Sequence, residues 1–328
     1  MDNIHSKVLQ MENQRLFSNL SSLVQLKKKG RKVGRLRFKG KNWFKTFTYN
    51  QSGFKLTHLK AKKGILYLSK IGDIPIKLHR QVEGTIKNIT IKKSLGKWYA
   101  SIITDAVIKR TCGTGEIGID VGIENYIYDS NGNAYENPKH FDKYHQELKT
   151  AQQSLSKKII GSNSRKKARL KAAKIHEKIG NARKDFIHKL STKLIKENKF
   201  IAIEKLNIKN LIGISYTAKN IADASWRKLA CYLHYKAENA GCAVIDVDPA
   251  YTTRNCSFCE HRNNKLELSQ RKFVCKKCNT ELPRDYNSAL NILVSGKELA
   301  TMEKAIPAEQ SIQQIVSMKS EAPSIRVG

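Results

Sequence analysis

Apolar residues follow two different periods in the N-terminal third of the chain. Over residues 2–25 they recur near a helical period, behind candidate capping residues Asp2 and Asn3. Over residues 36–104, short alternating or apolar runs at 44–49, 65–68, 85–91 and 98–104 are separated by turns that contain glycine. Short strands at such close spacing are typical of a small barrel. We therefore predict one amphipathic helix followed by a small β-barrel.

From residue 117 onward, apolar strand-like runs alternate with longer amphipathic segments. We predict strands at 117–123, 200–204 and 243–249, a hairpin with a type I′ turn at Asn131-Gly132, two helices within 141–198, a helix at 226–241 that stops at Gly241, and a helical run at 288–294. Strands that alternate with helices predict an α/β domain. The polar segment 299–328 is predicted to be a disordered tail.

The charge balance indicates the class of partner. The chain has 61 Lys and Arg against 28 Asp and Glu, a formal net charge of +33 on 328 residues. Such a field suits a polyanion, because neutralising phosphates releases counterions. The segment from Lys143 to Lys199 holds 17 basic residues against four acids. A basic helical hairpin of this kind predicts one wall of a nucleic-acid channel, with a merely solvated face as the alternative.

Basic and aromatic residues interleave over residues 35–47, which include Lys39 and Lys41. The pattern suits backbone contact combined with base stacking, although the rings fit a barrel core equally well. The apolar stretches are too short to span a bilayer, and the first twenty residues lack the apolar segment of a secretory signal. We therefore expect a nucleic-acid partner and no membrane.

Two Cys-x-x-Cys pairs near the C-terminus carry the most specific chemical signal. Cys256 and Cys259 form the first pair, and Cys275 and Cys278 form the second, with fifteen residues between the inner cysteines. Each pair offers two thiolates to one side of an ion, and the loop lets the second pair complete a tetrahedron. With all four positions filled, the spacing predicts a structural zinc site without an open catalytic position. The remaining cysteines stand in apolar runs and are predicted to be buried thiols in a reducing cytosol: Cys112, Cys231 and Cys242.

Three carboxylates lie within or beside apolar elements, where an unpaired charge is costly. Asp120 interrupts the first strand of the α/β region, Glu204 ends the second, and Asp285 follows the cysteines. Any one of them could be a salt-bridge partner, and Asp285 could cap its helix. Together they predict a cluster of hard oxygen ligands, which select Mg²⁺ or Mn²⁺. Two such ions can activate a water and stabilise the leaving 3′ oxygen in phosphodiester hydrolysis.

Other acids compete for the same role. Asp246 and Asp248 lie on the third strand, but Asp248 precedes Pro249 at the strand exit and is interpreted as a turn former. Glu124, just beyond the first strand, is predicted to face solvent.

The ordered segments GIDVGIENYIYDSNG, FIAIEKLNIKNL, VDPAYTTRNCSFC and VCKKCNTELPRDYNSALNIL resemble the successive signatures of the TnpB (OrfB) transposon proteins, and SGFKL near the N-terminus also fits. The resemblance covers most of the chain and implies a RuvC-like nuclease on an RNase H fold, with a wedge-like barrel and a helical lobe that grip a guide RNA. It implies that Asp120, Glu204 and Asp285 are the catalytic, magnesium-binding acids, and that the four paired cysteines hold zinc. It also implies an RNA-guided enzyme acting on double-stranded DNA in the cytoplasm of a prokaryote, associated with the nucleoid.

The resemblance also predicts the domain organisation. Residues 1–30 would be part of a recognition-lobe helix with a basic linker, 31–112 a wedge-like nucleic-acid-binding barrel, and 113–298 a RuvC-like nuclease domain. The nuclease domain would contain the basic hairpin 141–198 and a zinc ribbon at 252–282.

Three features depart from the family pattern. The match starts inside the last helix of the recognition lobe, so we expect part of that lobe and the first barrel strand to be absent. The residue after each cysteine pair is usually Gly, which suits a positive φ, but here it is Glu260 or Asn279. The first turn is therefore expected to be strained or differently shaped. Pro283 stands where an acidic residue is common, two positions before Asp285.

The leading hypothesis is thus an RNA-guided, Mg²⁺-dependent DNA endonuclease associated with a transposable element. The alternative is a non-cleaving nucleic-acid-binding remnant or repressor, which the short N-terminus favours and the complete set of acids opposes. A transposase that joins strands by the same metal chemistry is a third hypothesis.

Overall fold

The computed structural model describes residues 3–38, 40, 43–59, 62–107, 110–214, 218–263 and 270–305. The chain divides into two compact units, Met1–Ile108 and Lys109–Gly328, and each is described by itself. None of the helices in these described ranges is both long enough and apolar enough to cross a membrane.

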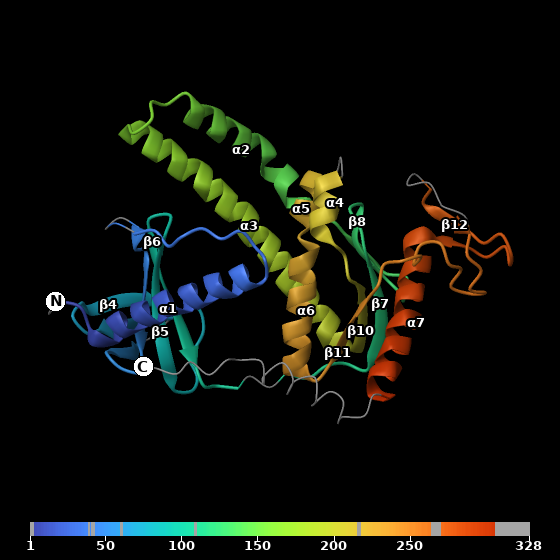
Figure 1. Cartoon of the computed structure of the whole chain (residues 1–328), viewed down its shortest axis with the longest axis horizontal. Coiled ribbons are helices and arrows are strands. Elements are labelled where there is room, and N and C mark those ends of the chain that lie inside the picture. Colours follow the sequence, from blue (N-terminus) through green and yellow to red (C-terminus); the bar gives the residue numbers. More distant parts are fainter. Residues whose placement is uncertain are drawn as a thin grey trace. The chain divides into compact units, whose positions relative to one another are not determined.

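The described residues of the first unit form one helix and two antiparallel sheets (Figure 1). Helix α1 (Ser6–Lys28) packs on strand β1 (Thr46–Asn50), which pairs with β5 (Ile86–Ser94), and β5 pairs with β6 (Lys97–Thr104). The other sheet has the order β2 (Phe54–His58), β3 (Lys63–Leu68) and β4 (Gly72–Lys77). The side chains of Tyr49, Leu66, Leu68 and Ile89 fill the core between them.

The predicted barrel is only partly right, because the described strands form two separate three-stranded sheets over one core. Pro75 lies in β4, and proline is confined to edge strands because it has no N–H to donate. The predicted cap of α1 was also wrong. His5 is the N-cap, and its Nδ1 accepts a hydrogen bond from the backbone N–H of Lys7, whereas Asp2 lies outside the described residues.

The basic aromatic stretch 35–47 exposes most of its rings. Phe38, Trp43 and Phe44 are 97%, 72% and 61% exposed, and only Phe47 packs against the core. Of the two explanations for these rings, core packing therefore holds for Phe47 alone. The predicted contributions of Lys39 and Lys41 fall outside the described residues.

The second unit is built on a five-stranded sheet in the order β11-β10-β7-β8-β9. Strands β7 (Gly115–Val121), β10 (Asn198–Glu204) and β11 (Ala243–Val247) are parallel, while β8 (Asn125–Asp129) and β9 (Ala134–Glu136) complete an antiparallel edge. The α/β architecture predicted for this half is confirmed.

Helices cover the two faces of this sheet unequally. On one face, the isoleucines of β7 and β10 pack against α3 (Asn163–Glu197), α5 (Ala218–Ala224) and α6 (Trp226–Ala240). The other face is covered by α7 (Arg284–Ala305), whose Ile292 packs on Ala202 and Val247. The remaining helices are α2 (His140–Ser156), which pairs with α3 as the predicted hairpin, and α4 (Ile208–Ile214).

Two glycines let α7 lie directly on the sheet. A Cβ on Gly118 would stand 2.2 Å from the carbonyl oxygen of Ala289, and a Cβ on Gly296 would stand 2.4 Å from the Cβ of Ala202. Both contacts are shorter than side chains tolerate, so only glycine permits this separation between helix and sheet.

Of three local predictions, one is confirmed and two need correction. The hairpin at Asn131-Gly132 forms, but only Gly132 has a positive φ, because the Asp129 carboxylate accepts hydrogen bonds from the N–H groups of Asn131 and Asn133 and shapes a longer turn. Gly241 ends α6 in the left-handed conformation, as predicted. Helix α7 continues to Ala305, past the predicted start of the tail at residue 299, and residues 306–328 lie outside the described ranges.

Candidate functional site

Asp120, the next-to-last residue of β7, and Glu204, the last residue of β10, lie at the same level of two neighbouring strands. The parallel register of β7 and β10 pairs Ile119 with Ile203, so the next residue on each strand is a carboxylate. Side chains alternate along a strand, and Gly118 and Ala202 face α7. Asp120 and Glu204 therefore point to the face of the sheet that α7 covers.

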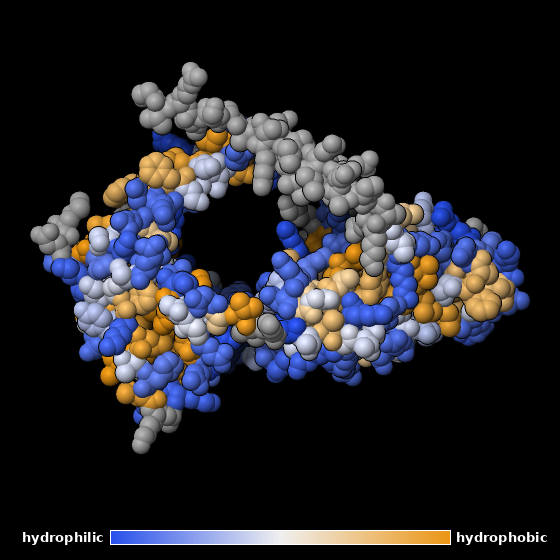
Figure 2. Space-filling model, turned by 90° about the horizontal axis from the view of Figure 1, so that it is seen from below, coloured by the Kyte–Doolittle hydropathy of each residue, from blue (hydrophilic) through white to orange (hydrophobic). Residues whose placement is uncertain are grey.

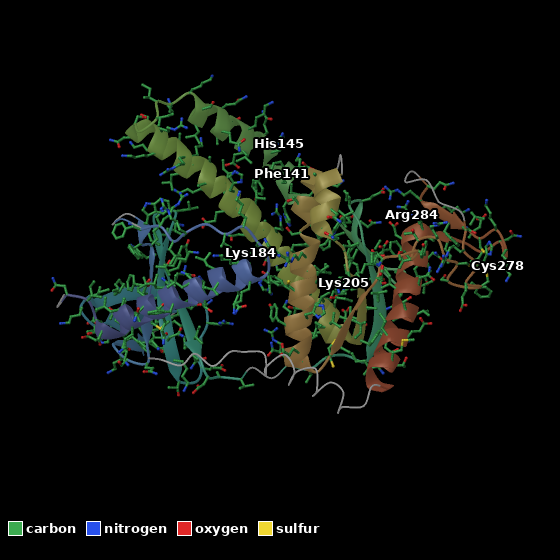
Figure 3. All side chains as sticks on the ribbon, in the orientation of Figure 1. Phe141, His145, Lys184, Lys205, Cys278 and Arg284 are labelled. Atoms are coloured by element: carbon green, nitrogen blue, oxygen red, sulfur yellow. The ribbon has the colours of Figure 1, made fainter. Side chains whose placement is uncertain are left out.

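Asp285 reaches the same region from α7. It lies in the first turn of that helix rather than at the capping position, and its Oδ1 is 3.4 Å from Nε of Arg284. Figure 3 shows Arg284 at this end of α7, beside the cysteine-containing segment. The helix packs on β7, β8, β10 and β11, so its start is held against the strands that carry the other two acids.

The charges of Glu204 and Asp285 both reach Asp120. Burial raises the pKa of Asp120 well above its ordinary value, and the charges of Glu204 and Asp285 raise it further, while Arg284 opposes the shift. Burial also raises the pKa of Glu204, against a hydrogen bond from Thr252. Half-buried carboxylates, one of which is destabilised as an anion by its two neighbours, fit a divalent cation, whose charge removes that penalty. Across the described ranges, only the four paired cysteines place all ligand atoms within 4.8 Å of one another, so the carboxylates are spaced more widely than that.

The competing acids have other partners. Asp246 pairs with Ile203 in the parallel register and contacts Nε2 of His234 at 3.0 Å, on the side of α6. Asp248 Oδ1 accepts a hydrogen bond from the N–H of Ala250, which confirms its interpretation as a turn former. Glu124 is exposed, as predicted, and forms an ion pair with Arg271.

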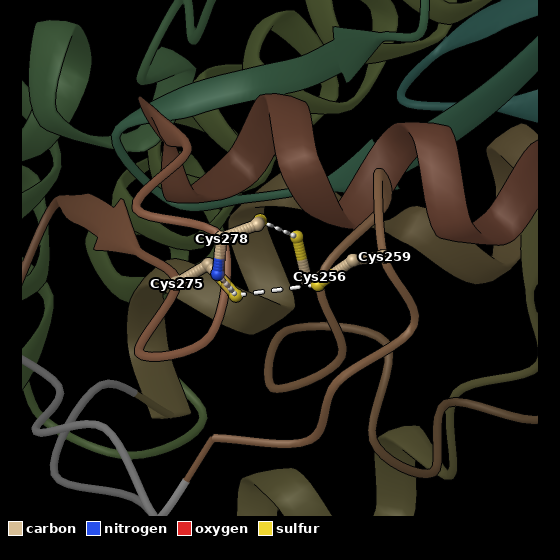
Figure 4. Close-up of side chains that lie close together, drawn as sticks. All are labelled: Cys256, Cys259, Cys275 and Cys278. Atoms are coloured by element: carbon tan, nitrogen blue, oxygen red, sulfur yellow. Dashed lines mark hydrogen bonds between the residues drawn. The ribbon is translucent and has the colours of Figure 1, made fainter.

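The four paired cysteines converge at one point (Figure 4). The Sγ atoms of Cys256 and Cys278 are 3.7 Å apart, and those of Cys259 and Cys275 are 3.5 Å apart. Zn–S bonds of about 2.3 Å in a tetrahedron separate sulfurs by about 3.8 Å, so these positions fit zinc. The hydroxyl of Thr280 lowers the pKa of Cys278, which favours the thiolate at that position.

The turns after the two cysteine pairs use the left-handed conformation without glycine. Glu260 has a φ of 59° and Asn279 a φ of 57°. The first turn therefore keeps its shape and is strained by a non-glycine residue, whereas Asn tolerates this conformation better. Strands β12 (Lys272–Val274) and β13 (Glu281–Pro283) pair beside the second turn, with Pro283 opposite Lys272.

Residues 252–282, which contain the four paired cysteines, are called the cysteine ribbon below. Three polar residues that the sequence did not single out connect this ribbon to the acids. Thr252 donates a hydrogen bond from Oγ1 to Oε1 of Glu204 at 2.7 Å. On α7, Asn287 and Asn291 donate to the carbonyl oxygen of Asn255, and Asn291 also donates to that of Thr252. Isolated polar residues show no periodicity in the sequence. Only the spacing of Asn287 and Asn291, which are four residues apart on α7, could have indicated that they share one face of the helix.

The prediction for the other three cysteines was wrong in part. Cys231 is exposed, and Cys112 and Cys242 are half-buried. Cys231 lies on the outward part of α6 because Leu229 and Leu233, on either side of it, point into the core.

Comparison with known proteins agrees with this architecture. The model of the OrfB_IS605 family, described as a probable transposase, matches residues 102–215, and the Cas12f1-like TNB domain matches residues 226–292. A chain in a solved Cas12f1–sgRNA–target DNA complex aligns with a TM-score of 0.55 and 18% identity, covering 84% of this chain and 69% of that one. The fold is therefore that of a Cas12f1-like α/β protein.

Two relatives carry the name "Putative RNA-guided DNA endonuclease". InsQ of Escherichia coli (strain K12) is 31% identical over 295 residues, which span 85% of this chain and 72% of InsQ. The protein from Streptomyces pristinaespiralis is 37% identical over 203 residues, which span 61% of this chain and 50% of that protein. The chain belongs to the TnpB (OrfB) family, a transposon-associated family related to RNA-guided DNA endonucleases.

Proposed function

We propose that this chain is itself an RNA-guided DNA endonuclease that depends on Mg²⁺ or Mn²⁺ and carries a RuvC-like nuclease domain. One observation supports this most strongly. Asp120 and Glu204 lie at one level on adjacent parallel strands, and burial raises the pKa of Asp120, which the charges of Glu204 and of Asp285 on α7 raise further. Acids brought together from three elements suit a metal site better than a set of separate salt bridges.

In this proposal the three carboxylates hold the catalytic ions, which would activate a water and stabilise the leaving 3′ oxygen of the DNA strand. The residues around them supply position. Thr252 holds one oxygen of Glu204, the contact of α7 with the sheet sets the place of Asp285, and Arg284 balances the negative charge. Cys256, Cys259, Cys275 and Cys278 would hold one structural zinc ion.

The nucleic-acid partners are proposed from charge and exposure. The α2–α3 hairpin contains most of the 17 basic residues counted above, packs around a small core of its own, and presents many of these residues to solvent. Figure 2 shows hydrophilic residues over much of one face of the molecule. We propose that guide RNA and double-stranded DNA bind these surfaces and the exposed rings before β1, in a protein that works beside DNA in a prokaryotic cytoplasm. The solved structure to which this chain is similar contains Cas12f1 in a complex with sgRNA and target DNA.

A cleavage assay tests the proposal. Purified protein with its co-purified RNA and Mg²⁺ should cut a matching DNA, and Asp120→Ala should abolish cutting while RNA binding stays within about twofold, because Asp120 lies away from the basic hairpin surface. Preserved cutting by Asp120→Ala would remove the assignment of the acids. An RNA-binding wild type that leaves the DNA intact at every Mg²⁺ and Mn²⁺ concentration would favour the non-cleaving alternative, and strand-transfer products would favour the transposase.

A further inference from the structure

The side chain of Thr252 contacts the proposed metal site without being a metal ligand of the predicted set. It is 5% exposed and lies four residues before the first cysteine of the ribbon. Its Oγ1 is 2.7 Å from Oε1 of Glu204 and 3.3 Å from the carbonyl oxygen of Pro249. Because a hydroxyl has one proton to donate, the shorter contact identifies the Glu204 carboxylate as the acceptor.

A single hydrogen bond of this kind restricts what a carboxylate can do. Oε1 of Glu204 is tied to Thr252, so the side chain cannot rotate freely about its last torsion, and the second oxygen is left in a defined direction. Loss of a group that orients a metal ligand through a hydrogen bond typically weakens metal binding by about 10- to 100-fold.

The position of Thr252 is fixed in turn by contacts between the ribbon and α7. Asn291 Nδ2 donates to the carbonyl oxygens of Thr252 and Asn255 at 2.8 and 2.7 Å. Asn287, one helical turn earlier, donates to the carbonyl oxygen of Asn255 and accepts from the N–H of Ser257. Asn287 is fully buried, so these bonds are shielded from water.

These contacts form one chain of bonds from the cysteine ribbon to the acid cluster. Ser257 lies between two zinc-ligand positions, Asn287 lies two residues after Asp285, and Thr252 touches Glu204. A displacement of the ribbon would therefore move both Thr252 and the start of α7.

We propose that Thr252 is a positioning residue, which holds the Glu204 carboxylate in its metal-binding orientation and through which the cysteine ribbon controls the affinity of the catalytic metal site. This inference rests on the proposed function, because it needs Glu204 to be a metal ligand.

The test uses the full-length, zinc-loaded protein and Mn²⁺ alone as the probe. Binding of Mn²⁺ is followed by electron paramagnetic resonance, and the Mg²⁺ dependence of DNA cleavage is measured beside it. Thr252→Val removes the hydroxyl and keeps the shape, Thr252→Ser keeps the hydroxyl, and Thr253→Val makes the same change at the next residue as a matched control. Zinc content and unfolding temperature show whether each variant folds.

Thr252→Val should weaken Mn²⁺ binding by about 10- to 100-fold and raise the Mg²⁺ concentration for half-maximal cleavage by a similar factor, with much of the rate recovered at saturating metal. Thr252→Ser should stay within about threefold of wild type, since the hydroxyl is the group that matters, and Thr253→Val should match wild type. Unchanged Mn²⁺ affinity in Thr252→Val would overturn the inference, and so would equal loss in the Ser and Val variants, which would mean that packing rather than the hydrogen bond is responsible.

Glu204→Gln separates this failure from failure of the proposed function. If Glu204→Gln loses Mn²⁺ and Thr252→Val does not, the metal site stands and only the positioning role is wrong. If Glu204→Gln binds Mn²⁺ as wild type does, Glu204 is not a ligand, and both proposals are wrong.

Discussion

Adding one methyl group at Gly118 should separate α7 from the sheet and with it Asp285 from the other two acids. In Gly118→Ala the new Cβ would stand 2.2 Å from the carbonyl oxygen of Ala289 and 2.5 Å from the backbone nitrogen of Leu293. Both are backbone atoms of a helix and cannot move aside alone. Extending the shorter contact to 3.0 Å requires about 0.8 Å of movement of the helix.

This movement of α7 should change both the unfolding free energy and the cleavage rate. Overpacking of a close contact typically costs about 1–3 kcal/mol of unfolding free energy. A misplacement near 1 Å in a catalytic site costs on the order of 100-fold in rate. We therefore expect Gly118→Ala to lower the unfolding temperature by several degrees and to reduce the rate of DNA cleavage roughly 100-fold. The fall in rate should be much larger than the fall in the fraction of folded protein at the assay temperature.

The assay compares calorimetric unfolding with single-turnover cleavage at saturating Mg²⁺. Gly180→Ala is the matched control, because Gly180 lies within α3 and nothing stands within 4 Å of its added Cβ. That variant should be more stable by up to about 1 kcal/mol, from helix propensity, and should cut at the wild-type rate. If Gly118→Ala unfolds and cleaves as wild type does, the close contact of α7 with β7 does not position Asp285.

Three further predictions concern the acids and the ribbon. Asp120→Asn should abolish cleavage and raise the unfolding temperature of the metal-free protein at neutral pH. Because the pKa of Asp120 is raised above its ordinary value of 3.8, the folded state binds more protons than the unfolded state at pH values between the unfolded and the folded pKa, and the stability of the metal-free wild type should fall as pH rises through that range. A flat profile of stability against pH in the wild type would contradict this. Glu260→Gly should raise the unfolding free energy of the zinc-loaded protein by about 1 kcal/mol in chemical denaturation, because the left-handed conformation strains Glu260. Asn279→Gly should raise it by less. A lower unfolding free energy in Glu260→Gly would show that contacts of the Glu260 side chain outweigh the strain. A zinc-selective chelator should release one zinc ion per chain and weaken Mn²⁺ binding at Asp120, Glu204 and Asp285, which is measured by titration followed by electron paramagnetic resonance. Unchanged Mn²⁺ binding after zinc release would show that the two metal sites are independent.

Elements with a strong local pattern were predictable from the sequence. The strands that carry Asp120 and Glu204 are apolar runs with one exception each, and an ionisable residue in such a run is visible without any structure. Gly241 ended its helix as predicted, since a left-handed terminal residue depends on the local backbone alone.

Features that depend on contacts between distant segments were not predictable. The arrangement of the N-terminal strands as two sheets depends on which edges pair, and the local alternation of side chains is the same in a barrel. The bond from Thr252 to Glu204 joins residues 48 positions apart, and a buried threonine leaves no mark in the sequence. The exposure of Cys231 follows from the phase of α6 against the sheet, which an apolar stretch does not specify.

The conformation of the turns after the two cysteine pairs was also not predictable from the sequence, for a different reason. The family usually has glycine at both positions, and Glu260 in place of glycine left open whether the first turn is strained or differently shaped, whereas Asn279 tolerates the left-handed conformation better. Both residues keep the left-handed φ, because the four sulfurs fix the path of the backbone on either side.

The most direct measurement of the central claim is an anomalous difference map of the full-length protein crystallised with Mn²⁺. We expect a Mn²⁺ peak among the carboxylates of Asp120, Glu204 and Asp285, at about 2.0–2.3 Å from their oxygens, that disappears in the Asp120→Ala variant while the zinc peak at the cysteines remains. A Mn²⁺ peak that contacts none of these carboxylates, or that survives in Asp120→Ala with unchanged occupancy, would contradict the assignment of this cluster as the catalytic metal site.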